Sequence, residues 1–207
     1  ILDMAKTLFS QQGYNAVSIG EIAGALGISK GNVTYHFKRK EDIMEALLAE
    51  ARQLADSGVK ELIVIAQDIT RYGMDLEKPT SLAGLLKELC KLDFHWIRLH
   101  YLYPEVITDE LIDTIAREKK IVHYLDIPIQ HCNDGILKAM RRRNTKVELE
   151  ELFARLRKAI PNVVIRTSLI CGLPGEGEAE FEELCEFLKE QVGGQAVLGR
   201  QIRQSTP

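Results

Sequence analysis

The sequence of 207 residues lacks the closely spaced cysteines and long apolar runs that are typical of disulfide-rich secreted, zinc-binding or membrane proteins. It has only four cysteines, and their wide spacing fits neither a zinc site nor a dense disulfide framework: Cys90, Cys132, Cys171 and Cys185. No apolar run approaches the roughly 18 residues that cross a bilayer, and no charged-then-apolar leader is present. We therefore expect a reduced, cytoplasmic protein without a membrane partner.

Charge of one sign is not in large excess either. The 27 Lys and Arg residues nearly balance the 30 Asp and Glu residues, for a net charge of -3. This balance excludes a globally basic nucleic-acid coat, although it allows a local basic patch. Apolar residues make up 45% and charged residues 28%, which is typical of a folded chain and excludes wholesale disorder.

The hydrophobic pattern changes near residue 56. Before this point it has helical spacing, and four helices are expected, over 1–12, 18–26, 29–37 and 40–55. Ser18 and Glu21 form a capping box at the start of the second of them. After it, short apolar strands alternate four times with helices, which predicts parallel strands with crossover helices. The strands are expected at 62–66, 96–101, 122–129 and 163–170.

The second and third helices have the spacing of a helix-turn-helix. A short second helix fits the DNA major groove, where polar side chains reach base edges. Such side chains are available on this helix at Ser29, Lys30, Asn32, Thr34 and Tyr35. Residues 29–40 contain four cations and no acid, as contact with DNA phosphates requires.

The segment SIGEIAGALGISKGNVTYHFKRKEDIMEALL, with ILDMAKTLFSQQGY before it, resembles the DNA-binding domain of TetR-family transcriptional regulators. The resemblance covers about residues 1–50. It implies binding of double-stranded DNA, with these residues at or beside the duplex: Lys30, Gly31, Asn32, Thr34, Tyr35, His36 and Lys40. That family binds DNA as dimers through a helical ligand-binding domain, which this sequence does not contain.

Residues 51–190 resemble a different family, the radical SAM methylthiotransferases. The strings WIRLHYLYPEVITDELIDTIAREKKIVHYLDIPIQHCNDGILKAMRRRNT and PNVVIRTSLICGLPGEGEAEFEELCEFL carry the resemblance. It is nearest to the branch that modifies an aspartate of a small-subunit ribosomal protein. The implied fold is a partial (β/α) barrel with its active site at the carboxyl ends of the strands.

This second resemblance implies a site for S-adenosylmethionine at the strand ends. The residues expected around the cofactor are Gln67, Asp68, Asp126, Gln130, Arg166, Ser168, Gly172 and Gly175. Arg166 would pair with the carboxylate of the cofactor, and the two glycines would let the backbone approach it closely. The other interpretation is that Gln67 and Gln130 only satisfy buried backbone groups.

One element of radical SAM chemistry is missing from the sequence. The family holds a [4Fe–4S] cluster with a Cys-x-x-x-Cys-x-x-Cys loop, and no such triplet occurs here. We therefore expect no catalytic residue, no metal site and no cofactor chemistry from this sequence alone. Cys90 and Cys185 are expected to pack in helices, whereas Cys132 and Cys171 lie near strand ends, where two thiols could bind a stray metal.

Together these patterns predict an α/β fold with an all-α N-terminal part. A helix-turn-helix bundle (1–50) would be joined to a partial barrel of about four parallel strands (51–191), followed by a tail (192–207). The leading hypothesis is sequence-specific binding of double-stranded DNA. The alternatives are a methylthiotransferase acting on a ribosomal protein, and a chimera without function joined within Lys40–Ala55. Uncovered sheet edges at Leu62–Ala66 and Val163–Ile170 predict either a four-stranded open sheet with helices on both faces or self-association through these edges.

Overall fold

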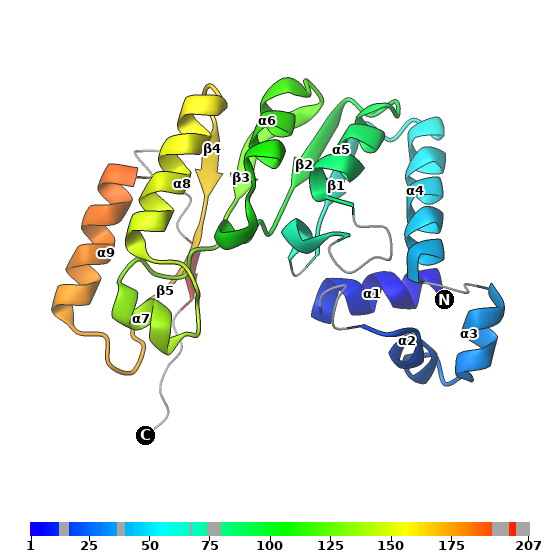
Figure 1. Ribbon diagram of the computed structural model, residues 1–207, viewed down its shortest axis with the longest axis horizontal. Coiled ribbons are helices and arrows are strands. Elements are labelled where there is room, and N and C mark those ends of the chain that lie inside the picture. The colour runs from blue at the N-terminus through cyan, green and yellow to red at the C-terminus, as the bar shows by residue number, and fades with distance from the viewer. Residues whose placement is uncertain (13–16, 37–39, 67, 74–79, 192–198, 202–207) are drawn as a thin grey trace. The chain divides into compact units, whose positions relative to one another are not determined.

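The computed structural model describes residues 1–12, 17–36, 40–66, 68–73, 80–191 and 199–201. The chain divides into two compact units, each described by itself below. The first comprises Ile1–Tyr101 and Glu118–Val122, and the second comprises Leu102–Arg117 and His123–Pro207. Figure 1 shows the helices and strands of both. Among the described helices, none is both long enough and apolar enough to span a bilayer.

The first unit begins with four helices, at the positions expected from the apolar spacing. They are α1 (Leu2–Gln12), α2 (Ile19–Ala25), α3 (Lys30–His36) and α4 (Lys40–Asp56). The capping box is confirmed: Glu21 N–H donates to Ser18 Oγ (3.2 Å), and Ser18 N–H donates to Glu21 Oε2 (2.6 Å). A small core holds α1 and α2 together, formed by Ala5, Leu8, Val17 and Ile22.

Two parallel strands follow in the same unit, β1 (Glu61–Val64) and β2 (Trp96–Leu99), with Leu62 opposite Ile97. Between them lie the short 3-10 turn η2 (Ile69–Arg71) and helix α5 (Leu82–Cys90). Side chains alternate across the pair. Ile97 and Leu99 of β2 are fully buried, whereas Ile63 on the other face of β1 is 52% exposed.

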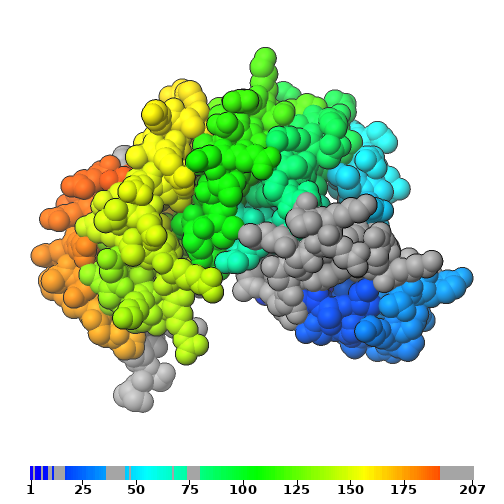
Figure 2. All heavy atoms as spheres, in the orientation of Figure 1, coloured from blue at the N-terminus to red at the C-terminus, as the bar shows by residue number. Residues whose placement is uncertain are grey.

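The second unit repeats the strand–helix alternation. Its elements are η3 (Pro104–Val106), α6 (Asp109–Arg117), β3 (Ile121–Asp126, which begins in the first unit), α7 (Asp134–Ala139), α8 (Lys146–Ala159), β4 (Val164–Arg166), β5 (Ser168–Ile170), α9 (Glu178–Gln191) and β6 (Gly199–Gln201). Asn133 caps α7, and Thr145 with Glu148 forms a capping box on α8. Helices α8 and α9 lie side by side (Figures 1 and 2), with the rings of Phe153 and Phe187 6.0 Å apart.

The strand order of the main sheet is β1-β2-β3-β4, and β3 pairs with β4 in parallel. The expected fold class, a mixed α/β chain with a sheet of four parallel strands, is thus confirmed in its α/β part. The prediction of a single strand over 163–170 is wrong, because the strand is interrupted at Thr167 and forms two short strands, β4 and β5. The Thr167 side chain explains the break, since Ile129 N–H donates to its Oγ1 (3.2 Å) in place of a regular ladder bond.

The second half of the broken strand has its own partner. β5 pairs in parallel with β6, with Ser168 opposite Gly199. The expectation that all of Val163–Ile170 is an uncovered edge is therefore wrong for its last three residues. The short strand β6 also lies inside the segment expected to be a tail.

Candidate functional site

The site is built around an ion pair at the carboxyl ends of two neighbouring strands. Asp126 ends β3 and Arg166 ends β4, and the strand register places them opposite each other. Arg166 Nη1 lies 2.7 Å from Asp126 Oδ1. The Asp126 side chain is 1% exposed and that of Arg166 is 31% exposed. A buried carboxylate thus fixes a guanidinium whose outer part reaches the surface, and whose forked donors suit a carboxylate or phosphate ligand.

A glycine-bearing turn follows β5 and closes around one carboxylate. Gly172 N–H and Leu173 N–H donate to Glu176 Oε2, at 2.7 and 2.9 Å. Gly172 and Gly175 have φ angles of 80° and 94°, where a side chain would strain the backbone. A Cβ on either would meet no atom within 4 Å. The turn therefore needs glycine for its conformation and leaves open space beside its backbone.

His131 lies beneath this turn and is fully buried. Asn133 N–H donates to His131 Nδ1 (3.0 Å), so Nδ1 accepts and the neutral ring carries its proton on Nε2. His131 Nε2 lies 3.6 Å from Glu176 Oε1, and the Glu176 side chain is 3% exposed. Burial lowers the pKa of His131, an effect that the nearby Glu176 carboxylate opposes.

A polar network continues from His131 to helix α9. Asn133 Nδ2 donates to Glu183 Oε2 (2.7 Å), and Lys146 Nζ lies 2.9 Å from Glu183 Oε1. The hydrogen bonds from Asn133 and Lys146 lower the pKa of Glu183. The hydrogen bond between Lys146 and Glu183 also raises the pKa of Lys146. These contacts connect helix α9 to the segment after β3 and to the start of α8.

The remaining residues expected around the cofactor have mixed outcomes. Gln130, at a φ of 69°, forms an isolated bridge with Leu169 of β5, so its backbone joins the two segments. Ser168 begins β5 and is partly buried. Asp68, in the first unit, caps η2, where it accepts from Thr70 N–H and pairs with Arg71 at 2.9 Å. Gln67 lies outside the described residues.

The four cysteines do not fit an iron–sulfur cluster. Burial raises the pKa of the Cys132 thiol to about 12 and that of Cys90 to about 11, which disfavours the thiolates that ligate iron. Cys132 is fully buried, whereas Cys171 is exposed. Within the described residues, no group of three or more His, Cys, Asp or Glu side chains is arranged to hold a metal ion.

The residues expected at DNA lie on or beside α3. Val33 is fully buried, whereas Tyr35 on the same helix is 82% exposed. Others on this surface are also exposed: Ser29, Lys30, Gly31 and Asn32. Thr34 is partly buried, and its hydroxyl donates to backbone carbonyls of its own helix. Of His36 and Lys40 the structure describes only the helical backbone.

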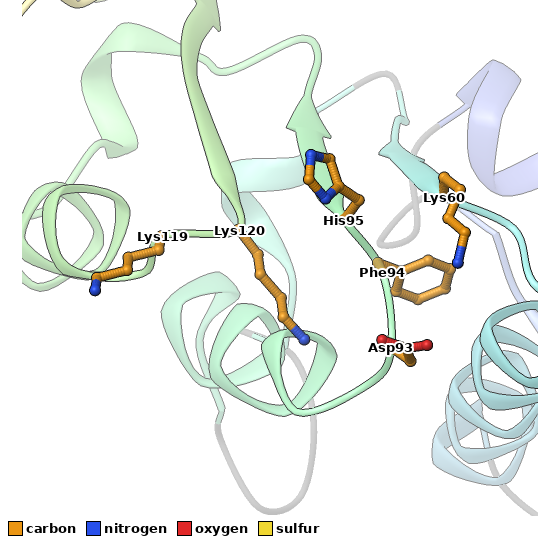
Figure 3. A pocket seen from close by; sticks show the side chains of 6 residues that line it. All are labelled: Lys60, Asp93, Phe94, His95, Lys119 and Lys120. Atoms are coloured by element: carbon orange, nitrogen blue, oxygen red, sulfur yellow. The ribbon is translucent and has the colours of Figure 1, made fainter.

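A separate cavity of about 480 Å³ lies in the first unit (Figure 3). It is lined by residues next to the amino ends of three strands: Lys60, Asp93, Phe94, His95, Lys119 and Lys120. Lys120 Nζ donates a hydrogen bond to the carbonyl oxygen of Leu92, just after α5. In Figure 3 the Lys119 side chain points away from that of Lys120. The Lys119 and Lys120 amines therefore diverge, and these two cations do not converge on one point of the cavity.

Sequence reasoning missed His131 and Asn133, and it placed Glu176 near the cofactor only as the last residue of the glycine-bearing turn. All three lie inside the motifs that were recognised, but their contacts join segments up to 50 residues apart. A histidine directly after an apolar strand was a usable sequence signal for His131. Thr167 gave no signal, because its hydroxyl acts on the backbone of Ile129.

Comparison with known proteins gives one family and one set of relatives. A family model described as the radical SAM superfamily matches residues 19–188. Proteins named ribosomal protein uS12 methylthiotransferase RimO, from Alkaliphilus oremlandii and Lachnoclostridium phytofermentans, are 51% and 54% identical over 148 residues. Each match covers 71% of this chain but 34% of the relative. The chain thus spans about a third of the length of these curated relatives.

Among solved structures, coproporphyrinogen III oxidase (HemN) from Escherichia coli, described as a radical SAM enzyme, is similar. The TM-score is 0.56 at 16% identity, over 75% of this chain and 36% of that chain. At this identity the likeness shows the fold alone. The family model begins at residue 19, inside the segment expected to resemble TetR regulators. The TetR-like interpretation of residues 1–50 stays a prediction.

Proposed function

The chain belongs to the radical SAM superfamily, and from that premise we propose that its second unit binds S-adenosylmethionine at the carboxyl ends of β3 and β4. The observation that carries the proposal is the Asp126–Arg166 pair, 2.7 Å long, with Asp126 buried and Arg166 partly exposed. The guanidinium would hold the carboxylate of the cofactor. The turn from Gly172 to Glu176 would offer backbone and open space beside the pair.

The residues of this unit would bind and orient the cofactor. Asp126 would hold the Arg166 guanidinium in one direction, so that little side-chain entropy is lost on binding. Glu176 would fix the turn by accepting from Gly172 N–H and Leu173 N–H. S-adenosylmethionine itself would supply a reactive sulfonium. The cysteines of this sequence do not fit the iron–sulfur cluster, so no step is assigned through a cluster.

Calorimetric titration of the full chain with S-adenosylmethionine tests this proposal. Arg166→Gln should lower the affinity about tenfold or more, because a charge-assisted hydrogen bond is worth roughly 1.5–3 kcal/mol. Arg155→Gln is a matched control, since Arg155 pairs with Asp109 at 2.9 Å in the same unit but on helices. Absence of binding to the wild-type chain, or equal losses in both variants, would contradict the proposal.

For the whole protein we propose a methylthiotransferase that acts on ribosomal protein uS12. This proposal is supported by relatives of that name, which are identical to this chain at about half of the 148 aligned residues. Anaerobic reconstitution with iron and sulfide tests what this chain contributes. We expect no stable cluster, because Cys132 is buried with a thiol pKa of about 12. A stable brown chromophore would show that its cysteines do ligate iron.

A second candidate function is binding of double-stranded DNA by α3. The observation that favours it is the division of this helix into a buried side, at Val33, and an exposed side, at Lys30, Asn32 and Tyr35. Packing of α3 through Val33 would leave the polar side chains available to a groove.

Gel-shift titrations at two salt concentrations test the DNA-binding candidate. Binding driven by phosphate contacts should weaken as salt rises. Lys30→Ala with Tyr35→Ala should abolish most of it, whereas Lys91→Ala should not, because Lys91 already pairs with Glu88 on α5. A shift that is absent, or insensitive to salt, would rule this candidate out.

A further inference from the structure

The strongest unassigned surface is the loop between α7 and α8, where three arginines follow one another: Arg141, Arg142 and Arg143. Arg141 and Arg143 are exposed, and Arg142 is partly buried. None of the three pairs with a carboxylate among the described residues. Two other exposed arginines of the same unit do have such partners, since Arg117 pairs with Asp113 at 3.3 Å and Arg155 with Asp109 at 2.9 Å. Among the described residues, no carboxylate therefore compensates the charge of this arginine loop.

The backbone of the arginine loop is fixed. Arg141 N–H donates to the Lys138 carbonyl (3.0 Å) and Arg142 N–H to that of Leu137 (2.8 Å), which ends α7. This places Arg141 at a φ of 58°, in the left-handed region. Glycine is the residue that this helix end favours, and a larger residue costs on the order of 1 kcal/mol there. Helix termination therefore does not explain an arginine at this position.

Aromatic stacking holds the second arginine in place. Arg142 Cζ lies 4.8 Å from the centroid of the Tyr103 ring. Such a contact orients a guanidinium without consuming its hydrogen-bond donors. Asn144, which follows Arg143 at the end of the loop, is 7% exposed. Its Nδ2 has no hydrogen-bond partner among the described residues. The loop thus combines a stacked guanidinium with an unsatisfied buried donor.

The acids nearest in sequence are already engaged. Residues 135–147 hold five cations and no carboxylate. Before them, Asp134 accepts from Lys146 N–H (2.8 Å), and after them Glu148 accepts from Thr145 N–H (2.7 Å). Glu183 pairs with Lys146, so Lys138 and the three arginines have no carboxylate partner in the part of the chain that the structure describes. A chain with a net charge of -3 thus concentrates positive charge on one short loop.

We propose that the arginine loop binds single-stranded RNA through its phosphates. Adjacent guanidinium forks match phosphate oxygens, and a guanidinium held over a tyrosine ring is a planar group on which an unpaired base can stack. An acidic protein segment would use the charge of the loop but not this stacking plane. This proposal uses a surface that the S-adenosylmethionine site does not include, and it does not depend on that site.

Fluorescence anisotropy with a labelled, mixed-sequence single-stranded RNA and the full chain tests the proposal. The test variant is Arg141→Gly with Arg143→Gln. Glycine suits the φ of 58° at position 141, so this variant should fold at least as well as the wild type. We expect its affinity to fall about tenfold or more at low salt, with a salt dependence shallower by the contribution of about two phosphates.

The controls separate this loop from other cations. Arg117→Gln removes an exposed arginine of the same unit that already pairs with Asp113, and it should change the RNA affinity less than about twofold. Absence of RNA binding by the wild type, or equal binding by the double variant, would overturn the proposal. Loss with Lys30→Ala instead would assign the RNA to α3, and competition by polyglutamate as strong as by RNA would indicate an acidic protein partner.

Discussion

Single residues at the strand ends of the second unit either present a charge at the surface or hold the backbone of the neighbouring turn. Arg166 offers charge, whereas His131 and Glu176 hold the turn beside it. The fully buried His131 ring accepts a hydrogen bond at Nδ1 and faces a carboxylate with Nε2. A second proton would place a charge in the interior, so burial outweighs the attraction of Glu176 and lowers the pKa of His131.

Stability should therefore depend on pH through His131. Because its pKa is lowered in the folded chain, the unfolded chain takes up more protons as pH falls below about 6.5. The free energy of unfolding should then decrease from about pH 6.5 downward. His131→Asn should flatten this slope, even if it lowers stability at every pH. Urea unfolding at a series of pH values measures it.

Val147→Asn serves as the control for this measurement. Val147 is 59% exposed in the same unit and carries no titratable proton, so this variant should leave the slope as in the wild type. Below about pH 4.5, a second loss of stability is expected from Glu183, whose pKa is lowered by Asn133 and Lys146. A wild-type slope that persists in His131→Asn would contradict the assignment to His131.

At the scale of elements, turns and caps decide where helices end. Ile28 N–H donates to the Ala23 carbonyl (3.0 Å) across the end of α2, and Gly27 between them has a φ of 66°. Gly24, one turn earlier, is helical, and neither glycine would bring a new Cβ within 4 Å of another atom. The two positions differ in backbone conformation rather than in available space.

This pair of glycines gives a prediction of opposite signs. Gly24→Ala should stabilise the α2–α3 segment by about 0.5–1 kcal/mol, because alanine favours the helix. Gly27→Ala should destabilise it by about 1 kcal/mol, because a side chain is strained at positive φ. Hydrogen exchange of the Leu26 and Ile28 amides in the full chain measures both changes. The same sign in both variants would show that packing, not the backbone, dominates.

At the scale of the whole molecule, β1 is an end strand of the main sheet. Ile63 and Ile65 are 52% and 53% exposed on and just after this strand, and Trp96 of the neighbouring strand is 47% exposed. An apolar strand at the edge of a sheet is a template for pairing with another chain. Self-association through β1 therefore remains a prediction of the fold.

Size-exclusion chromatography with light scattering tests this association. The wild type should be dimeric or larger, with the dimer favoured as concentration rises. Ile63→Lys with Ile65→Lys should shift it toward the monomer, since charged side chains block edge pairing. Val147→Lys is the control, because Val147 is 59% exposed on α8 and not on a strand. A wild type that stays monomeric at high concentration would refute the prediction.

Much of the fold could be predicted because it depends on local patterns. Helix starts followed from capping residues, as at Ser18, and helix faces from apolar spacing. The candidate site could be proposed from the sequence only by resemblance, and the role of Arg166 in binding the cofactor stays a prediction. The break at Thr167 and the burial of His131 could not be predicted, because each depends on a partner far away in the sequence.

The sequence by itself determined the order of helices and strands, since hydrophobic period and capping act over a few residues. It also determined the family, and the absence of a three-cysteine loop from these 207 residues. Only the tertiary structure decided which charges compensate each other. Asp126 meets Arg166 across 40 residues, whereas Arg141 and Arg143 meet no acid among the described residues. Charge pairing depends on distance in space, and the chain sets that distance only when its strands and helices pack.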